Sequence, residues 1–152
     1  MTDIYNYPYI GLDGAEGVMT LCSGPVVIHE DKVLLHISDS TGKYQFIGGR
    51  LNDKLSMREN ALERAEAVLG HRDLILGDTP LSVIGEIERD GKIETVVLFH
   101  YKAVLTDLDH IGAGEWKTLD EIEQLSHENM LSSNNVIIAS KHFLLGECLI
   151  HD

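Results

Sequence analysis

The residues best suited to chemistry in this sequence gather between Tyr44 and His71. Three glutamates, Glu59, Glu63 and Glu66, follow one another at intervals of four and three residues, so a helix would place them in one stripe. Carboxylate oxygens are ligands that Mg²⁺ prefers, so this stripe could hold a divalent cation. The same spacing is typical of a charged helix face that contacts only water, and we favour that interpretation.

A helix must position these glutamates, and the sequence predicts one between Ser56 and Gly70. Ser56 precedes Glu59 by three residues, which is the spacing of a capping box. Apolar residues then recur at helical intervals as far as Leu69. Gly70 is suited to the left-handed conformation that commonly ends a helix. A short apolar strand, a Gly-Gly turn and a polar loop come before this helix.

The segment 44–71 resembles the signature of the Nudix hydrolases, in which a Gly-Gly turn leads into a loop and a helix that carry metal-binding glutamates. Aligned on Gly49 and Gly70, the spacing fits without a gap, and Gly48 and Arg50 stand where the family has similar residues. The resemblance therefore predicts a Nudix fold with a degenerate Nudix box and no family-type Mg²⁺ or Mn²⁺ site. The positions of the family's glutamates are occupied here by Leu55, Arg64, Ala67 and Val68.

The resemblance extends over most of the chain, roughly from residue 17 to residue 145. It implies an α/β fold of the Nudix type, an α/β/α sandwich with a mixed β-sheet between helices. We expect a single domain over residues 1–152, with residues 1–15 as an N-terminal arm. Three apolar runs, at 18–22, 26–28 and 33–37, precede the Gly-Gly turn. After the first helix we expect a connection over 71–80 and then a hairpin of 81–89 with 93–105 across Asp90-Gly91. A capping box at Thr118 and Glu121 and a last helix over 134–145 complete the pattern.

Composition excludes some functions and favours others. The formal net charge of −13 argues against nucleic acids and anionic membranes as partners, because both are polyanions. No apolar run approaches the ~20 residues that span a bilayer, and we expect a cytoplasmic protein. Cys22 and Cys148 are expected to be free thiols. His36 and His100 lie in apolar strands, and we expect core or pocket groups with satisfied hydrogen bonds rather than metal ligands.

Two functional hypotheses follow from the altered box. In the first, the protein is a non-classical or catalytically inactive Nudix-fold member that binds a nucleoside-diphosphate-type or other small ligand without a cofactor. The expected binding residues are Gly48, Gly49, Arg50 and Arg64, since a guanidinium at a former metal position could hold a diphosphate through a bidentate contact.

In the second hypothesis, the protein is a divergent Nudix hydrolase that cleaves a nucleoside diphosphate linked to another moiety. Its catalytic carboxylates would be relocated to Glu59, Glu63, Glu66 and Glu115, and it would use Mg²⁺ or Mn²⁺. The sequence leaves open whether the protein is an enzyme. A third possibility is an interaction protein whose pocket has closed around Leu55 and Val68. Members that share this resemblance are commonly dimers, which makes a homodimer an expected assembly.

Overall fold

The computed structural model describes residues 6–10, 16–89 and 92–146, and these form a mixed β-sheet with three helices. Within the described residues, β2 and β8 are parallel neighbours at the centre of the sheet, and the other strand pairs are antiparallel. The elements in chain order are β1 (Asn6–Ile10), β2 (Glu16–His29), β3 (Lys32–Ile37), β4 (Tyr44–Gln45), β5 (Gly49–Arg50), α1 (Met57–Leu69), β6 (Leu74–Leu76), β7 (Leu81–Arg89), β8 (Lys92–Leu105), β9 (Glu115–Thr118), α2 (Leu119–His127) and α3 (Asn135–Leu145).

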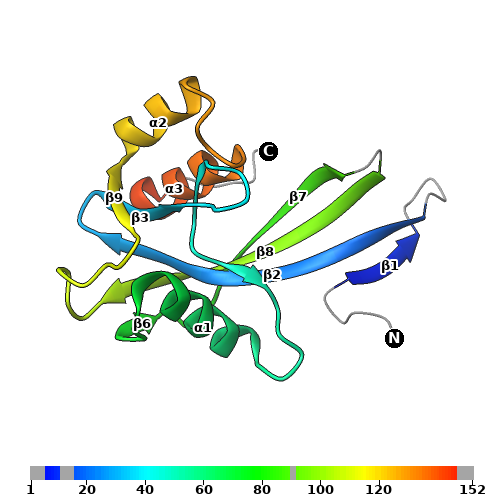
Figure 1. The fold of residues 1–152 in the computed structure, drawn as a ribbon, viewed down its shortest axis with the longest axis horizontal. Coiled ribbons are helices and arrows are strands. Elements are labelled where there is room, and N and C mark those ends of the chain that lie inside the picture. Colours follow the sequence, from blue (N-terminus) through cyan, green and yellow to red (C-terminus); the bar gives the residue numbers. More distant parts are fainter. Residues whose placement is uncertain (1–5, 11–15, 90–91, 147–152) are drawn as a thin grey trace.

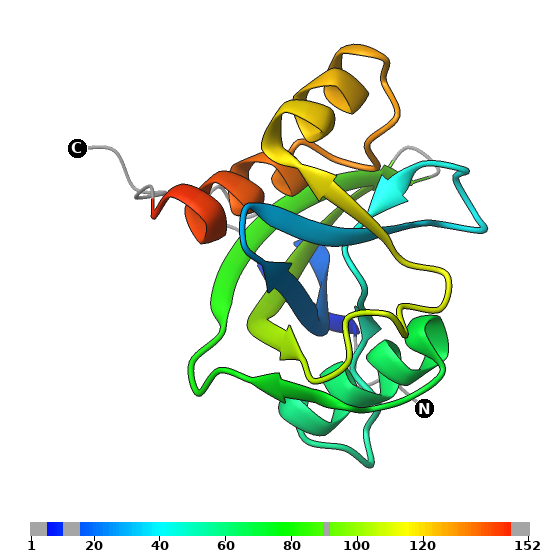
Figure 2. The ribbon, with the colours of Figure 1, turned by 90° about the vertical axis from the view of Figure 1, so that its left-hand side faces the viewer.

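Helices cover both faces of the sheet, as the resemblance predicted. Figure 1 shows α1 on one side of β2 and β8, with α2 and α3 on the other side. Figure 2, turned by 90°, shows the same separation of α1 from α2 and α3. Neighbouring residues of one strand serve the two faces: Val27 packs in the cluster beneath α1, and Val26 packs in the cluster beneath α3. Both side chains are fully buried, which explains why this part of the strand is apolar without alternation.

The first two apolar runs belong to one strand. The runs 18–22 and 26–28 both lie in β2, which continues from Glu16 to His29 through Gly24 and Pro25. Gly24 is needed where the chain crosses β2, since a Cβ atom there would lie 1.9 Å from the Ile47 carbonyl oxygen. The connection expected over 71–80 also contains a short strand, β6, which pairs with the end of β8.

Other expectations about local structure are confirmed. β7 and β8 form the hairpin, although Asp90 and Gly91 lie outside the described residues. The hydroxyl of Thr118 and the carboxylate of Glu121 make both bonds of a capping box at the start of α2. Of the N-terminal arm, residues 6–10 form β1 at the edge beside β2, and the rest lies outside the described residues. Among the described residues, no helix is long and apolar enough to span a membrane.

Candidate functional site

The loop before α1 is held by a buried asparagine that the sequence pattern did not single out. Asn60 is 1% exposed, and its Nδ2 donates to Ser23 Oγ at 2.9 Å. Its Oδ1 accepts from the Asn52 backbone N–H at 3.1 Å. The Ser23 hydroxyl in turn donates to the Met57 carbonyl at 2.8 Å, so the first turn of α1 is bonded to β2. These bonds fix the loop after Gly49 against the sheet.

Both ends of α1 follow the sequence prediction. Ser56 Oγ accepts the Glu59 backbone N–H at 3.1 Å, and this bond satisfies one of the free donors of the first turn. Gly70 ends the helix with φ of 85°, and its N–H donates to the Glu66 carbonyl. On the face that meets the sheet, Ala61 and Ala65 are fully buried, and their small side chains let the helix approach closely.

A cavity of about 790 Å³ lies on the α3 side of the sheet, between β2, β8 and the start of α3. The segment from Ser40 to Arg50 forms another wall, which includes three residues expected to bind ligand: Gly48, Gly49 and Arg50. Arg64, the fourth, is not part of this lining. The lining side chains are largely apolar or uncharged polar groups from Thr20, Cys22, Ser23, Ser40, Thr41, Gln45, Phe46, Ile47, Val96, Leu98, Phe99, Ser132, Ser133, Asn135 and Val136.

Two charged side chains stand together in this lining. Arg50 Nη2 lies 4.0 Å from Glu94 Oε1, and Thr20 Oγ1 donates a hydrogen bond to the same carboxylate oxygen. The Glu94 side chain is 14% exposed, whereas that of Arg50 is 42% exposed. A carboxylate with so little contact with water is an effective acceptor for donors on a bound molecule, because water competes less for it.

His100 lines the cavity and does not have the satisfied hydrogen bonds that we expected. It is 5% exposed, it meets Phe46 edge-on at 5.0 Å, and its Nε2 is buried without a partner among the described residues. Burial lowers the pKa of His100 to about 4, so the ring is uncharged at neutral pH. His36 also has a buried Nε2 without a partner in the described structure, and burial lowers its pKa as well.

Several solved protein structures have a similar arrangement of strands and helices. A NUDIX-family hydrolase from Clostridium perfringens is 17% identical and matches 84% of this chain and 97% of its own, with a TM-score of 0.61. A NUDIX hydrolase from Nitrosomonas europaea is 19% identical over 83% and 88%, with a TM-score of 0.60. The chain has the Nudix hydrolase fold. An Ap4A hydrolase from C. elegans is also similar, at 15% identity over 82% and 97%, with a TM-score of 0.59. No family model and no curated protein matches the sequence.

In this Nudix fold, the positions that the sequence alignment assigns to the metal do not fit a hard cation. Mg²⁺ and Mn²⁺ need oxygen ligands, and Leu55, Ala67 and Val68 carry hydrocarbon side chains. Val68 packs against the core beneath α1, and its carbonyl accepts the Ala113 N–H at 3.0 Å. The described residues contain no group of three or more His, Cys, Asp or Glu side chains that could hold a metal ion.

Arg64, at the fourth of these positions, contacts the backbone of β5. Its Nη2 donates to the Arg50 carbonyl at 2.8 Å, and its Nε is buried without a partner in the described structure. The guanidinium lies so close to Gly49 that a Cβ atom there would be 2.8 Å from Nε. Arg64 therefore supports β5, the strand that carries Arg50.

The four glutamates of the hydrolase hypothesis lie apart from the cavity. Glu59, Glu63 and Glu66 are exposed on α1, and Arg72 lies 3.8 Å from Glu59 and 2.7 Å from Glu66. Glu115 on β9 accepts a bond from the Tyr44 hydroxyl at 3.1 Å and lies 3.6 Å from Lys117. Burial and this bond to Glu115 raise the pKa of Tyr44. None of the four lines the cavity.

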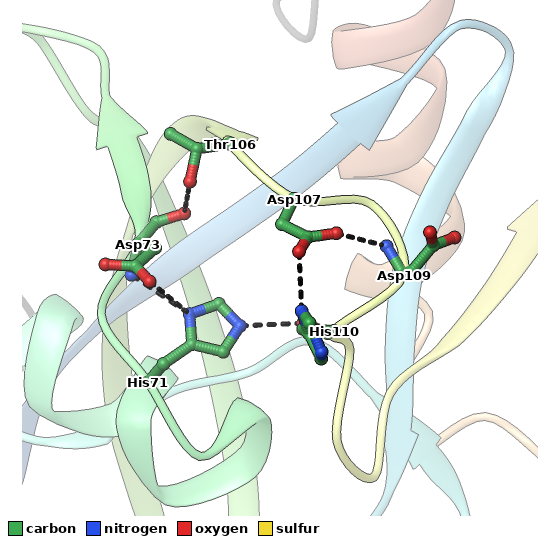
Figure 3. Close-up of polar contacts among 6 residues, drawn as sticks. All are labelled: His71, Asp73, Thr106, Asp107, Asp109 and His110. Carbon is green, nitrogen blue, oxygen red and sulfur yellow. Dashed lines mark hydrogen bonds and ion pairs between the residues drawn. The ribbon is translucent and has the colours of Figure 1, made fainter.

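A polar cluster ties the end of α1 to the loop after β8 (Figure 3). His71 Nε2 donates to the His110 carbonyl at 2.7 Å, and its Nδ1 accepts the Asp73 backbone N–H at 3.0 Å. Within the loop, His110 Nδ1 lies 2.6 Å from the Asp107 carboxylate. This bond and the Asp109 N–H, which contributes most, lower the pKa of Asp107. The cluster holds the loop against the helix face that includes Val68.

Asn60 and Glu94 were not predicted to shape or line the site, whereas His100 was expected to be a core or pocket group and does line the cavity. Glu94 and His100 are six residues apart in one strand, so both side chains project from the same face. That alternation was visible in the sequence, but it does not say which face carries a cavity. A polar residue among the apolar positions of a predicted helix was the available signal for Asn60.

Proposed function

We propose that the protein is a non-classical Nudix-fold protein that binds a small, nucleotide-like ligand in the cavity between β2, β8 and α3. The observation that carries this proposal is the cavity itself. Its volume of about 790 Å³ falls in the usual range for small-molecule sites. Its walls combine apolar side chains, such as Phe46, Ile47 and Leu98, with polar groups that can orient a ligand, among them Arg50, Glu94 and His100.

The proposal does not include hydrolysis at the family's metal site. Pyrophosphate cleavage in this family depends on a metal that neutralises the diphosphate and activates water. The residues at the aligned positions cannot supply oxygen ligands, so the Mg²⁺ or Mn²⁺ chemistry has no support from them. The alternative, a divergent hydrolase with relocated carboxylates, needs Glu59, Glu63, Glu66 or Glu115 to meet near a bound ligand. None of the four is among the residues that line the cavity, so the cavity gives that alternative no support.

Cytoplasmic location and a homodimer remain predictions from the sequence. The proposed partner is a small molecule, and nucleic acids and membranes are not expected partners because of the net charge of −13. Both predictions can be checked separately from ligand binding.

The test of the proposed function combines binding with turnover. Nucleosides, nucleoside mono- and diphosphates, ADP-ribose, nucleotide sugars and dinucleoside polyphosphates are titrated by calorimetry and followed by phosphorus NMR, each with Mg²⁺, Mn²⁺ or EDTA. We expect at least one of these compounds to bind with the same Kd in EDTA, without turnover. Ser132→Trp, which enlarges an exposed side chain in the cavity lining, should abolish this binding, whereas Glu63→Gln on the exposed face of α1 should not change it.

Two results would overturn the proposal. The first is turnover that scales with protein and is abolished by EDTA and by Glu66→Gln. The second is the absence of binding by every compound in the panel.

A further inference from the structure

Among the described residues that line the cavity, the charged side chains are one cation and one anion. Arg50 and Glu94 are the charged side chains among the lining residues that the structure describes, and they lie 4.0 Å apart. His100 is uncharged at neutral pH because it is buried. A bound anion would therefore meet one guanidinium, which already interacts with a carboxylate.

The neighbouring arginines on the described chain are used elsewhere. Arg64 donates to the Arg50 carbonyl. Arg58 donates to the carbonyls of Leu76 and Gly77 at 2.9 and 2.8 Å. Arg72 is paired with Glu59 and Glu66. Rotation of one of these side chains into the cavity would leave carbonyls or carboxylates without their present partners.

The polar groups of the cavity are spread along β8. Glu94 and His100 are separated by six residues, a distance of about 20 Å along an extended strand. Glu94 can only accept hydrogen bonds while it is ionised. His100 has a buried Nε2 without a partner in the described structure, and a buried polar atom without a partner calls for an explanation such as a bound molecule. A nucleoside-sized ligand is shorter than this separation, so it would contact one of these two groups and not both.

From this arrangement we infer that the ligand is a nucleoside-sized molecule with at most one negative charge, which donates hydrogen bonds to Glu94 and is bound without a diphosphate. This inference rests on the proposed function and names the class of ligand. A diphosphate carries at least two charges, and in this cavity they would lose water while facing a carboxylate and a single shared guanidinium. A nucleoside offers ribose hydroxyls or base N–H groups to Glu94 and an aromatic ring to walls that include Phe46 and Phe99.

The test is calorimetry in EDTA with adenosine, guanosine, cytidine and uridine, each compared with its 5′-monophosphate and 5′-diphosphate. For the nucleoside that binds best, we expect the diphosphate to bind at least tenfold more weakly. We also expect the Kd of the nucleoside to change less than twofold between 50 and 500 mM salt, because an uncharged ligand is not screened.

Glu94→Gln supplies the matched change of charge at the site. We expect this variant to bind the nucleoside at least fivefold more weakly and to reduce or reverse the preference for the nucleoside over its diphosphate. Glu115→Gln, outside the cavity, should leave the affinity for both compounds unchanged. Tighter binding of the diphosphate than of its nucleoside to the unaltered protein would overturn the inference and leave the proposed function standing. Absence of binding by all twelve compounds and by the rest of the panel would remove the proposed function and this inference with it.

Discussion

The two faces of the sheet use their polar residues differently. Beneath α1, Asn60 and Ser23 bond to each other and to the backbone of Asn52 and Met57, so the fold itself uses these groups. On the α3 side, His100 is buried with Nε2 unbonded in the described structure, beside a cavity of about 790 Å³. Under the proposed function, α1, the helix that carries the metal site in the family resemblance, has a structural role here, and the ligand binds on the opposite face.

The largest expected effect comes from the α1 side. Asn60→Leu keeps the side-chain volume but leaves the Asn52 N–H without its present acceptor and Ser23 Oγ without a donor. We expect the free energy of unfolding to fall by about 2–4 kcal/mol, because buried polar groups lose their partners. Urea denaturation measures the change, with exposed Glu63→Gln as the control. A loss below about 1 kcal/mol would show that this network does not stabilise the fold and would break the comparison.

On the cavity side, removal of a buried polar side chain should cost little stability. His100→Leu removes an unbonded nitrogen, so we expect no more than about 1 kcal/mol of destabilisation at pH 7, where loss of a bonded group would cost more.

The pH dependence of stability gives a second test of His100. The pKa of about 4 in the folded state lies below the ordinary value of 6.5, so the unfolded chain binds the proton more tightly.

Stability from His100 is therefore present above about pH 6.5 and is lost as the pH falls towards 4. Between pH 7 and pH 4.5 the loss is about 2 kcal/mol. We expect His100→Leu to remove this part of the pH dependence, while His127→Asn on the exposed end of α2 leaves it in place. Urea denaturation curves at several pH values measure the free energy of unfolding. If it depended on pH in His100→Leu as it does in the unaltered protein, the lowered pKa assigned to His100 would be contradicted.

The smallest expected effect concerns Arg64, which contacts β5 and, unlike Arg50, does not line the cavity. Arg64→Met removes one bond to the Arg50 carbonyl, and we expect a loss of about 1 kcal/mol in stability with less than a twofold change in ligand Kd. Lys54→Met, an exposed change in the loop before α1, is the matched control for the loss of a cation. A tenfold loss of affinity in Arg64→Met at unchanged stability would instead support direct contact between Arg64 and the ligand.

Much of the fold could be predicted because its signals are local. The caps at Ser56, Gly70 and Thr118 depend on residues within one helical turn, and the β7–β8 hairpin depends on a turn flanked by apolar runs. The continuity of β2 was not predictable in the same way. Glycine and proline, here Gly24 and Pro25, usually interrupt strands. The need for glycine at position 24 follows only from the close approach of the Ile47 carbonyl.

The candidate site was less predictable because it depends on which face of the sheet is covered. Gly48, Gly49 and Arg50 were found from the resemblance, and all three line the cavity. Glu94 and His100 lie in a long apolar strand whose two faces look alike in sequence, so their place at a cavity follows only from how α3 packs. Arg64 was predicted to bind ligand from its alignment with a metal position, and its bond to the backbone of Arg50 depends on the approach of α1 to β5.

The most direct measurement is an amide NMR titration of the labelled protein with Mg²⁺ alone and then with the best-binding compound in EDTA. We predict that the compound shifts the amides of Gly48, Gly49, His100 and Ser133 and that Mg²⁺ causes no saturable shift at Glu59, Glu63 or Glu66. Saturable Mg²⁺ shifts on α1, together with ligand shifts that appear only when Mg²⁺ is present, would contradict the assignment of the site to the cavity face.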